Sequence, residues 1–216
     1  MTNKPRTGLL LLRHGESFWN ANKKHLIGGR SNQTRLTPTG HRQTANVGER
    51  LLEAGIVPTH VHSSTAVRTI ESIGNALTAM RSDAEVFTDP ALQELSQGEW
   101  EGLLREACYT PEVRQEVQRL GLDFKAPGGE SMREVGERIA AWVGRTIAID
   151  PDVPELHLVS AHGVATRSYV ARQEGWTHSE IMANTLGNAT MTLMVPHDGQ
   201  WRLEYFGQDR PCPIVM

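Results

Sequence analysis

The chain has 216 residues, with 22 Lys and Arg against 25 Asp and Glu, a net charge of -3 and 38% hydrophobic residues. This length predicts a single domain over residues 1–216, and the balanced charge argues against a nucleic acid partner. The two cysteines, Cys108 and Cys212, form no CxxC motif, and the leucine run after the polar start is too short to span a membrane, so we expect a cytoplasmic protein without a targeting or membrane segment.

The first predicted element is a strand in the leucine run 9–12, which stops at Arg13, His14 and Gly15. Four consecutive leucines are typical of a strand that is buried on both faces. Arg13 and His14 then lie at the carboxyl end of a central strand, the edge at which open α/β sheets bind ligands. Because a neutral imidazole is a nucleophile and a guanidinium can hold a phosphate against it, this pair predicts an anion site suited to phosphoryl chemistry.

Residues 17–35 are polar and predict a long loop beside this site. The loop contains five cationic or titratable side chains, namely Lys23, Lys24, His25, Arg30 and Arg35. Loops of this length in compact domains are often functional, and these cations could contact a distal anion of a substrate. For Lys23 and Lys24 the alternative is an ordinary solvated surface.

A helix is predicted over residues 37–54, with Thr37 as N-cap and Pro38 at the first position. Its inward face is expected to consist of Ala45, Gly48, Leu51 and Leu52. The strand predicted next, residues 57–63, carries His60 and His62 on one face. Their spacing suits a metal ion, but no third ligand is evident nearby, so we interpret them as strand-end or packing histidines.

The segment after Ser63 and Ser64 predicts a helix with a clear apolar stripe. The stripe consists of Ala66, Ile70, Ile73, Leu77 and Met80. Arg68 lies off this stripe in the first turn, where it is either a solvated side chain or, with the amides of a helix N-terminus, part of an anion site.

The second half of the chain predicts further alternation of strands and helices. These elements are a strand at 85–88, a loop bearing Glu94, a short helix at 110–121, a helix from Ser131 to 147, a strand at 156–160 and helices from 164 and 177. They end with a strand that follows Ala189 and runs to Val195 and a strand at 201–206, the last at an edge. The apolar tail 211–216 is expected to pack back or to mediate association.

The strand at 156–160 also leads into a histidine, His162, and adjacent parallel strands would bring His14 and His162 to one edge of the sheet. The order of elements predicts a three-layer α/β/α fold with a mostly parallel central sheet and helices on both faces.

Several segments along the chain resemble the histidine phosphatase superfamily, whose best known branch is the cofactor-dependent phosphoglycerate mutases. The matching segments are Arg13-His14-Gly15-Glu16, Trp19-Asn20, Ser63-Ser64 with Arg68, Glu94 with Gly98-Glu99-Trp100-Glu101-Gly102, Pro127 to Ser131, and Ala161-His162-Gly163. The resemblance implies that His14 receives the phosphoryl group, that Arg13, Arg68 and His162 surround it, and that Glu94 protonates the leaving oxygen. It also implies substrate contacts from Asn20, Gly28 and Asn188. The resemblance implies in addition that the segment at about 103–128 is a small helical cap insertion. The chain departs from the family pattern at Ile27, Asn32 and Thr65.

These observations together predict a metal-independent phosphatase that hydrolyses a small phosphorylated metabolite through a phosphohistidine on His14, with no cofactor. The resemblance implies a longer cap insertion in the mutase branch, so the short cap of this chain favours the phosphatase branch. A 2,3-bisphosphoglycerate-dependent phosphoglycerate mutase is the nearest alternative. Two more distant hypotheses are a catalytically inactive module that binds phosphorylated ligands and a metal hydrolase built on His14, His162, His60 and His62. Relatives in the family are often dimers, and the sequence leaves a homodimer open.

Overall fold

The computed structural model describes residues 7–150 and 152–210, so the predicted role of the tail 211–216 lies outside the described residues. Within them, six strands form one sheet in the order β3-β2-β4-β1-β5-β6. The strands are β1 (Gly8–Arg13), β2 (His60–Ser63), β3 (Val86–Thr88), β4 (Leu156–Ala161), β5 (Met191–His197) and β6 (Gln200–Gln208). The pairs β1–β4, β4–β2 and β2–β3 are parallel, whereas β5 and β6 are antiparallel. The predicted, mostly parallel sheet with an edge strand after residue 200 is therefore confirmed.

The register of β1 and β4 positions the two histidines. Arg13 at the end of β1 pairs with Ala161 at the end of β4, so His14 and His162 are the next residues on two neighbouring parallel strands. Both strands end at the same edge of the sheet, so His14 and His162 converge there as the sequence predicted.

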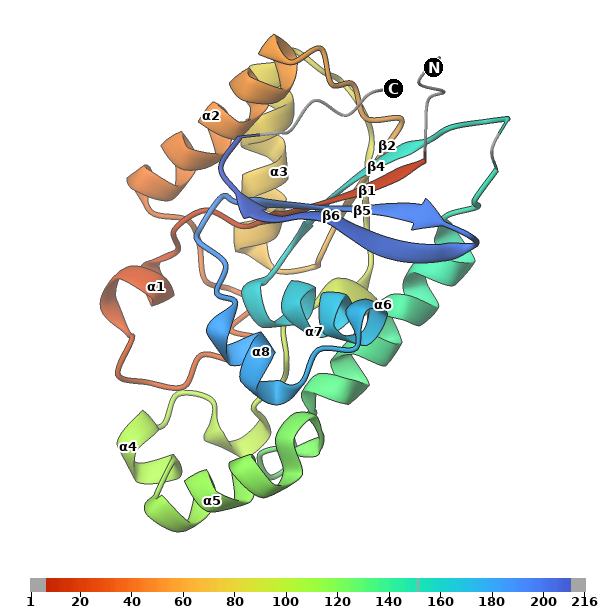
Figure 1. Ribbon diagram of the computed structural model, residues 1–216. Coiled ribbons are helices and arrows are strands. Elements are labelled where there is room, and N and C mark those ends of the chain that lie inside the picture. The colour runs from red at the N-terminus through yellow and green to blue at the C-terminus, as the bar shows by residue number, and fades with distance from the viewer. Residues whose placement is uncertain (1–6, 151, 211–216) are drawn as a thin grey trace.

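Helices cover both faces of the sheet (Figure 1). They are α1 (Phe18–Asn22), α2 (Pro38–Glu53), α3 (Val67–Met80), α4 (Arg105–Cys108), α5 (Pro111–Leu120), α6 (Met132–Thr146), α7 (Gly163–Glu174) and α8 (His178–Ala183), with short 3-10 helices at Pro90–Leu92, Gly98–Trp100 and Gly121–Asp123. The leucines of β1 alternate between the layers: Leu10 and Leu12 pack with α2 and α3, while Leu9 and Leu11 pack with α6 and α7. Each buried leucine contributes roughly 1.5–3 kcal/mol, and the double burial explains the uninterrupted run.

Some local predictions were wrong. Leu52 and Ile70, expected to face inward, are 45% and 43% exposed. Neighbouring helix residues point about 100° apart, and α2 turns Val47 and Leu51 toward the sheet, which leaves Leu52 outside. The loop predicted at 17–35 contains α1, because Ser17 and Asn20 form a reciprocal capping box.

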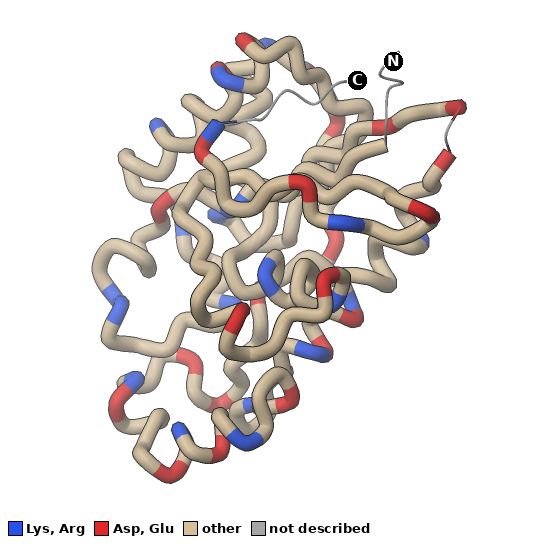
Figure 2. Tube along the Cα trace, in the orientation of Figure 1, with Lys and Arg blue, Asp and Glu red and all other residues tan. Residues whose placement is uncertain are grey.

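The segment 103–128 carries α4 and α5 and lies at one end of the molecule, away from the sheet (Figure 1). Basic and acidic residues are interspersed along the trace (Figure 2). Cys108 in this segment is a buried free thiol, and Cys212 lies outside the described residues. Over residues 7–150 and 152–210, no helix is long and apolar enough to cross a membrane.

Candidate active site

His14 is held at the end of β1 in one defined tautomer. Its Nδ1 lies 2.7 Å from the carbonyl oxygen of Gly15, and its Nε2 lies 3.2 Å from Nε of Arg68. A carbonyl only accepts and a guanidinium only donates, so the proton must be on Nδ1 and the lone pair on Nε2. The nitrogen that faces Arg68 is therefore the nucleophilic one.

Arg68 connects the two histidines. Besides His14, it donates from one terminal nitrogen to Nδ1 of His162 at 3.1 Å and from the other to the carbonyl oxygen of Ser31 at 2.9 Å. His162 therefore carries its proton on Nε2, which donates to Oγ of Ser64 at 2.9 Å. Arg68 is 4% exposed, and burial lowers its pKa to about 10, so it stays charged at neutral pH. The solvated alternative for Arg68 is excluded.

Both imidazoles are buried and uncharged at neutral pH. The ring centroids of His14 and His162 lie 5.4 Å apart. Burial, and next the charge of Arg68, holds the pKa of each well below the ordinary value of 6.5. A neutral imidazole beside a guanidinium is the protonation state that nucleophilic attack on phosphorus needs.

Arg13 provides a second guanidinium. One of its terminal nitrogens donates to the carbonyl oxygen of Leu186, while its buried Nε has no hydrogen-bond partner among the described residues. Burial lowers the pKa of Arg13. A side chain at Gly163 would crowd this guanidinium, with its Cβ 3.2 Å from Nε. An unpaired buried donor in a cavity wall is a ready partner for an oxyanion.

Glu94 is fixed at the N-terminus of α7. Its carboxylate accepts from the backbone N–H groups of Leu95 at 2.9 Å, Val164 at 3.1 Å and Ala165 at 2.8 Å. Because His162 gives α7 no side-chain cap, Glu94 satisfies donors that the helix end leaves free.

The loop around Glu94 is anchored by Arg138 of α6 and by Glu130, which lies just before that helix, and the sequence analysis gave neither of them this role. Arg138 donates to the carbonyl oxygens of Gln93 at 2.8 Å and Glu94 at 3.1 Å and forms an ion pair of 2.9 Å with Glu130. Glu130 in turn accepts from the backbone N–H of Ser96 at 3.0 Å. No local pattern marks this pair, because its partners are about 40 residues away.

The other predicted binding residues lie around the β1 end. Asn188 donates from Nδ2 to the carbonyl oxygen of His14 and to Oδ1 of Asn20, both at 3.2 Å. Gly28 passes close to the indole of Trp19, where an added Cβ would lie 2.7 Å from Nε1. Asn20 and Gly28 line the cavity described next, whereas Asn188 and His162 are not among the residues that line it.

A cavity of about 420 Å³ opens in front of His14. Its wall includes the predicted residues Arg13, His14, Asn20, Gly28, Arg68 and Glu94, and the further cationic side chains Lys24, Arg105 and Arg167. Of the other loop cations, Lys23 lies over the ring of Trp19 at 5.1 Å, and Arg30 pairs with Glu130 at 3.3 Å. Lys24 is thus the loop cation that faces the cavity.

A second cavity of about 400 Å³ adjoins the first and is lined in part by the segment 103–128. The two share wall residues that include Leu95, Tyr109, Met132 and Met182. The lining of the second cavity mixes apolar side chains, such as Val117 and Phe124, with charged ones, such as Arg114, Lys125 and Glu130. The site therefore combines a cationic cavity at the sheet edge with a second cavity of mixed character.

The four histidines of the proposed metal hydrolase do not converge. Over the part of the chain that the structure describes, the group able to hold a metal ion is His60, Glu155 and His157, and it contains neither His14 nor His162.

Comparison with known proteins places this site in a family. The sequence model of the histidine phosphatase superfamily (branch 1) matches residues 9–209. The chain is 31% identical over 183 residues to the 2,3-bisphosphoglycerate-dependent phosphoglycerate mutase of Bartonella henselae, covering 82% of this chain and 86% of that one. The same identity and coverage hold for the mutase of Brucella anthropi. Since the matched part is a similar share of both chains, these mutases are of similar length, so the length of this chain does not favour the phosphatase branch over the mutase branch.

Solved structures share the fold. A mycobacterial glucosyl-3-phosphoglycerate phosphatase superposes with a TM-score of 0.77 at 24% identity, over 94% of this chain and 99% of that one. A phosphoserine phosphatase from Entamoeba histolytica, in complex with 3-phosphoglyceric acid, gives a TM-score of 0.77 at 20% identity, over 97% of this chain and the whole of the other.

Proposed function

The chain belongs to the histidine phosphatase superfamily (branch 1), and from this premise we propose that it hydrolyses a small phosphomonoester through a phosphohistidine on His14. Members of the superfamily act as phosphatases or mutases, so the proposal concerns which group accepts the phosphoryl group: water, or a second hydroxyl of the substrate.

The proposed reaction has two steps. In the first, the lone pair on Nε2 of His14 attacks phosphorus in line and the bond to the leaving oxygen breaks. Glu94, which the anionic phosphate beside it keeps protonated in the complex, gives that oxygen a proton. In the second, water attacks the phosphohistidine, Glu94 takes the proton from the water, and inorganic phosphate leaves. Arg13 and Arg68 stabilise the charge on the phosphoryl oxygens. The guanidinium groups supply the positive charge that phosphoryl transfer needs, so the proposal requires no metal ion or other cofactor.

The observation that carries the proposal is the fixed tautomer of His14. Its Nδ1–H is committed to Gly15, and Arg68 lies against the remaining lone pair at 3.2 Å. A phosphate that enters between them replaces the imidazole as the acceptor for Arg68 and faces the nucleophile. His162, which accepts from the same guanidinium, orients Arg68 toward this position.

The second cavity supports hydrolysis of a larger ester. A mutase moves a phosphoryl group between two hydroxyls of one small polar molecule. The two adjoining cavities, of about 420 and 400 Å³, provide more room than a three-carbon phosphate fills, and the second offers apolar side chains such as Val117 and Phe124 beside its charged ones. We therefore propose a phosphomonoester that is larger than a three-carbon phosphate and has an apolar part in its leaving group.

Mutase activity is the second candidate, and the relatives named as phosphoglycerate mutases favour it. The cationic side chains Lys24 and Arg105 in the cavity wall are suited to a carboxylate or a second phosphate. A binding module without activity is disfavoured, because every group that the chemistry needs is present at the site.

The test is to trap the phosphoenzyme. The chain is mixed briefly with a labelled phosphomonoester and quenched in mild alkali, in which phosphohistidine survives. We expect acid-labile label on the wild-type chain and on the control His197→Ala, whose imidazole is exposed on the β5–β6 turn, and none on His14→Ala. Label that persists on His14→Ala would refute the assignment of the nucleophile.

A second measurement distinguishes water from a hydroxyl as acceptor. The chain is supplied with 2,3-bisphosphoglycerate and 3-phosphoglycerate, and separately with a panel of phosphomonoesters. Release of inorganic phosphate from the panel, without formation of 2-phosphoglycerate, supports the phosphatase. Conversion of 3- to 2-phosphoglycerate at a rate above that of phosphate release would establish the mutase instead.

A further inference from the structure

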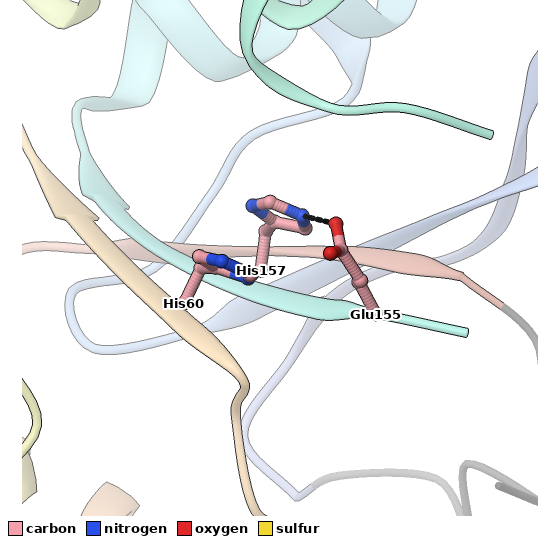
Figure 3. Close-up of side chains that lie close together, drawn as sticks. All are labelled: His60, Glu155 and His157. Atoms are coloured by element: carbon pink, nitrogen blue, oxygen red, sulfur yellow. Dashed lines mark hydrogen bonds and ion pairs between the residues drawn. The ribbon is translucent and has the colours of Figure 1, made fainter. Parts of the chain in front are cut away.

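A cluster of side chains lies far from the phosphate site, at the amino ends of β2 and β4 (Figure 3). His60 begins β2 and pairs in register with His157 of the parallel strand β4. Glu155 is two residues before His157, so its side chain projects to the same face of the sheet. The third ligand that the sequence did not reveal beside His60 is therefore supplied by another strand.

The three side chains already lie near metal-binding distances. One potential ligand atom from each of His60, Glu155 and His157 lies within 4.8 Å of the other two. Nε2 of His157 and Oε2 of Glu155 are 3.0 Å apart, and the rings of His60 and His157 stack with centroids at 4.7 Å. Zinc bonds of about 2.0–2.2 Å in a tetrahedron place ligand atoms about 3.4 Å apart, so modest side-chain rotations complete the set.

The residue behind His157 fits the same interpretation. Nδ1 of His157 shares a hydrogen bond of 3.2 Å with Nε2 of His62, whose ring packs edge-on against Trp142 of α6. With a metal ion on its Nε2, His157 would carry its proton on Nδ1 and donate it to His62. A partner on the second ring nitrogen is the usual means by which proteins orient a metal-binding histidine.

The charge and exposure also suit a cation. Among the described residues, the ion pair of Glu155 is with His157 and not with a lysine or arginine, so the carboxylate remains available to a metal. His157 is 1% exposed, whereas His60 and Glu155 are partly exposed, which gives an ion a route of entry and room for water as a further ligand.

We propose that His60, Glu155 and His157 bind a divalent transition-metal ion of the zinc class, at a site separate from the phosphate chemistry. Two imidazoles and one carboxylate are typical zinc ligands, and the hard cations Mg²⁺ and Ca²⁺ prefer all-oxygen sites. The ion joins β2 to β4 at the end of the sheet opposite to the catalytic edge, and binding to the folded state stabilises the chain.

The test is calorimetric titration of the full chain with Zn²⁺, with Mg²⁺ as the control metal. Because His14 and His162 could bind zinc independently, the titrations use the His14→Ala background. We expect one equivalent of Zn²⁺, no binding of Mg²⁺, and at least a tenfold rise in the Kd for Zn²⁺ in both His60→Ala and Glu155→Gln. These two positions are partly exposed, so the variants should fold, whereas His157 is too buried for a safe substitution.

The matched control is His197→Ala, since His197 also contacts a carboxylate, Asp198, at 3.2 Å but is exposed at the end of β5. It should leave the Kd unchanged. Zinc at about a hundred times the Kd should raise Tm by about 5 °C or more in the parent chain and in His197→Ala only. The absence of zinc binding, or equal Kd values and Tm shifts in His60→Ala and Glu155→Gln, would overturn the proposal. The measurement uses no substrate, so it is independent of the proposed phosphatase activity.

Discussion

Replacing Glu94 by Gln separates its two roles, as a proton donor and as the acceptor at the N-terminus of α7. In the structure Oε1 accepts from Leu95 and Ala165, and Oε2 accepts from Val164. The amide oxygen of Gln can keep the first two contacts, but its NH₂ group then faces the N–H of Val164. An unpaired buried donor and a lost charge at a helix N-terminus cost about 1–3 kcal/mol of stability. A domain with roughly 5–15 kcal/mol of stability remains folded after this loss.

The catalytic effect should depend on the leaving group. General acid catalysis contributes about 10²–10⁴-fold, which corresponds to about 2.7–5.4 kcal/mol in the activation barrier. We therefore expect kcat/KM for an alkyl phosphomonoester, which reports phosphoryl transfer to His14 and not the later attack by water, to fall by that factor in Glu94→Gln. For p-nitrophenyl phosphate, whose leaving group needs no proton, kcat/KM should fall less than about tenfold, because proton donation adds little to the departure of a good leaving group.

The assay compares kcat/KM for the two esters in the wild-type chain, in Glu94→Gln and in Glu99→Gln. Glu99 lies in the same loop but outside both cavity walls, so its variant should keep both rates. Thermal unfolding checks that each variant is folded at the assay temperature. Equal losses on both esters in Glu94→Gln would show that Glu94 acts through the position of α7 and would refute its role as the acid.

Three further predictions concern other parts of the site and its support. After burial, the charge of Arg68 is the next cause that lowers the pKa of His14, so in Arg68→Gln this pKa should rise and the acid limb of kcat/KM should move to higher pH. The rate should also fall at least a hundredfold. An acid limb that stays at the same pH in the pH–rate profile would contradict the effect of Arg68 on His14. Lys24→Ala should raise KM, and weaken its dependence on ionic strength, only for substrates with a second anionic group, which steady-state kinetics in graded salt can measure. Gly40→Ala should lose about 1–3 kcal/mol in urea unfolding because its Cβ would collide with the backbone of the chain after His14, whereas the control Gly74→Ala, with open space around it on α3, should gain up to about 1 kcal/mol.

The sequence predicted the parts of the site that depend on local pattern. Strand-end histidines after apolar runs, and parallel pairing of neighbouring strands, place His14 beside His162. The sequence also indicated Arg68, but the contact of one guanidinium with two imidazoles depends on how α3 sits over the sheet, which no local pattern encodes. The cluster of His60, Glu155 and His157 was missed for the same reason. Its third ligand is recognisable only once β2 and β4 are known to be neighbours in a particular register.

The two proposed sites lie at opposite ends of β4, and this separation can itself be tested. His157 and His162 are five residues apart, which is about 16 Å along a strand. Binding of zinc adds two positive charges to the site, and at 16 Å this amounts to about 0.5–2 kcal/mol for an effective dielectric constant between 80 and 20. That is about 0.4–1.5 pKa units downward, and the pKa of His162 is already well below 6.5, so its imidazole stays neutral. One equivalent of Zn²⁺ should therefore leave kcat/KM at pH 7 unchanged within about twofold. A tenfold change that disappears in Glu155→Gln would show that the two ends of the strand are coupled through the structure, and that distance does not isolate them.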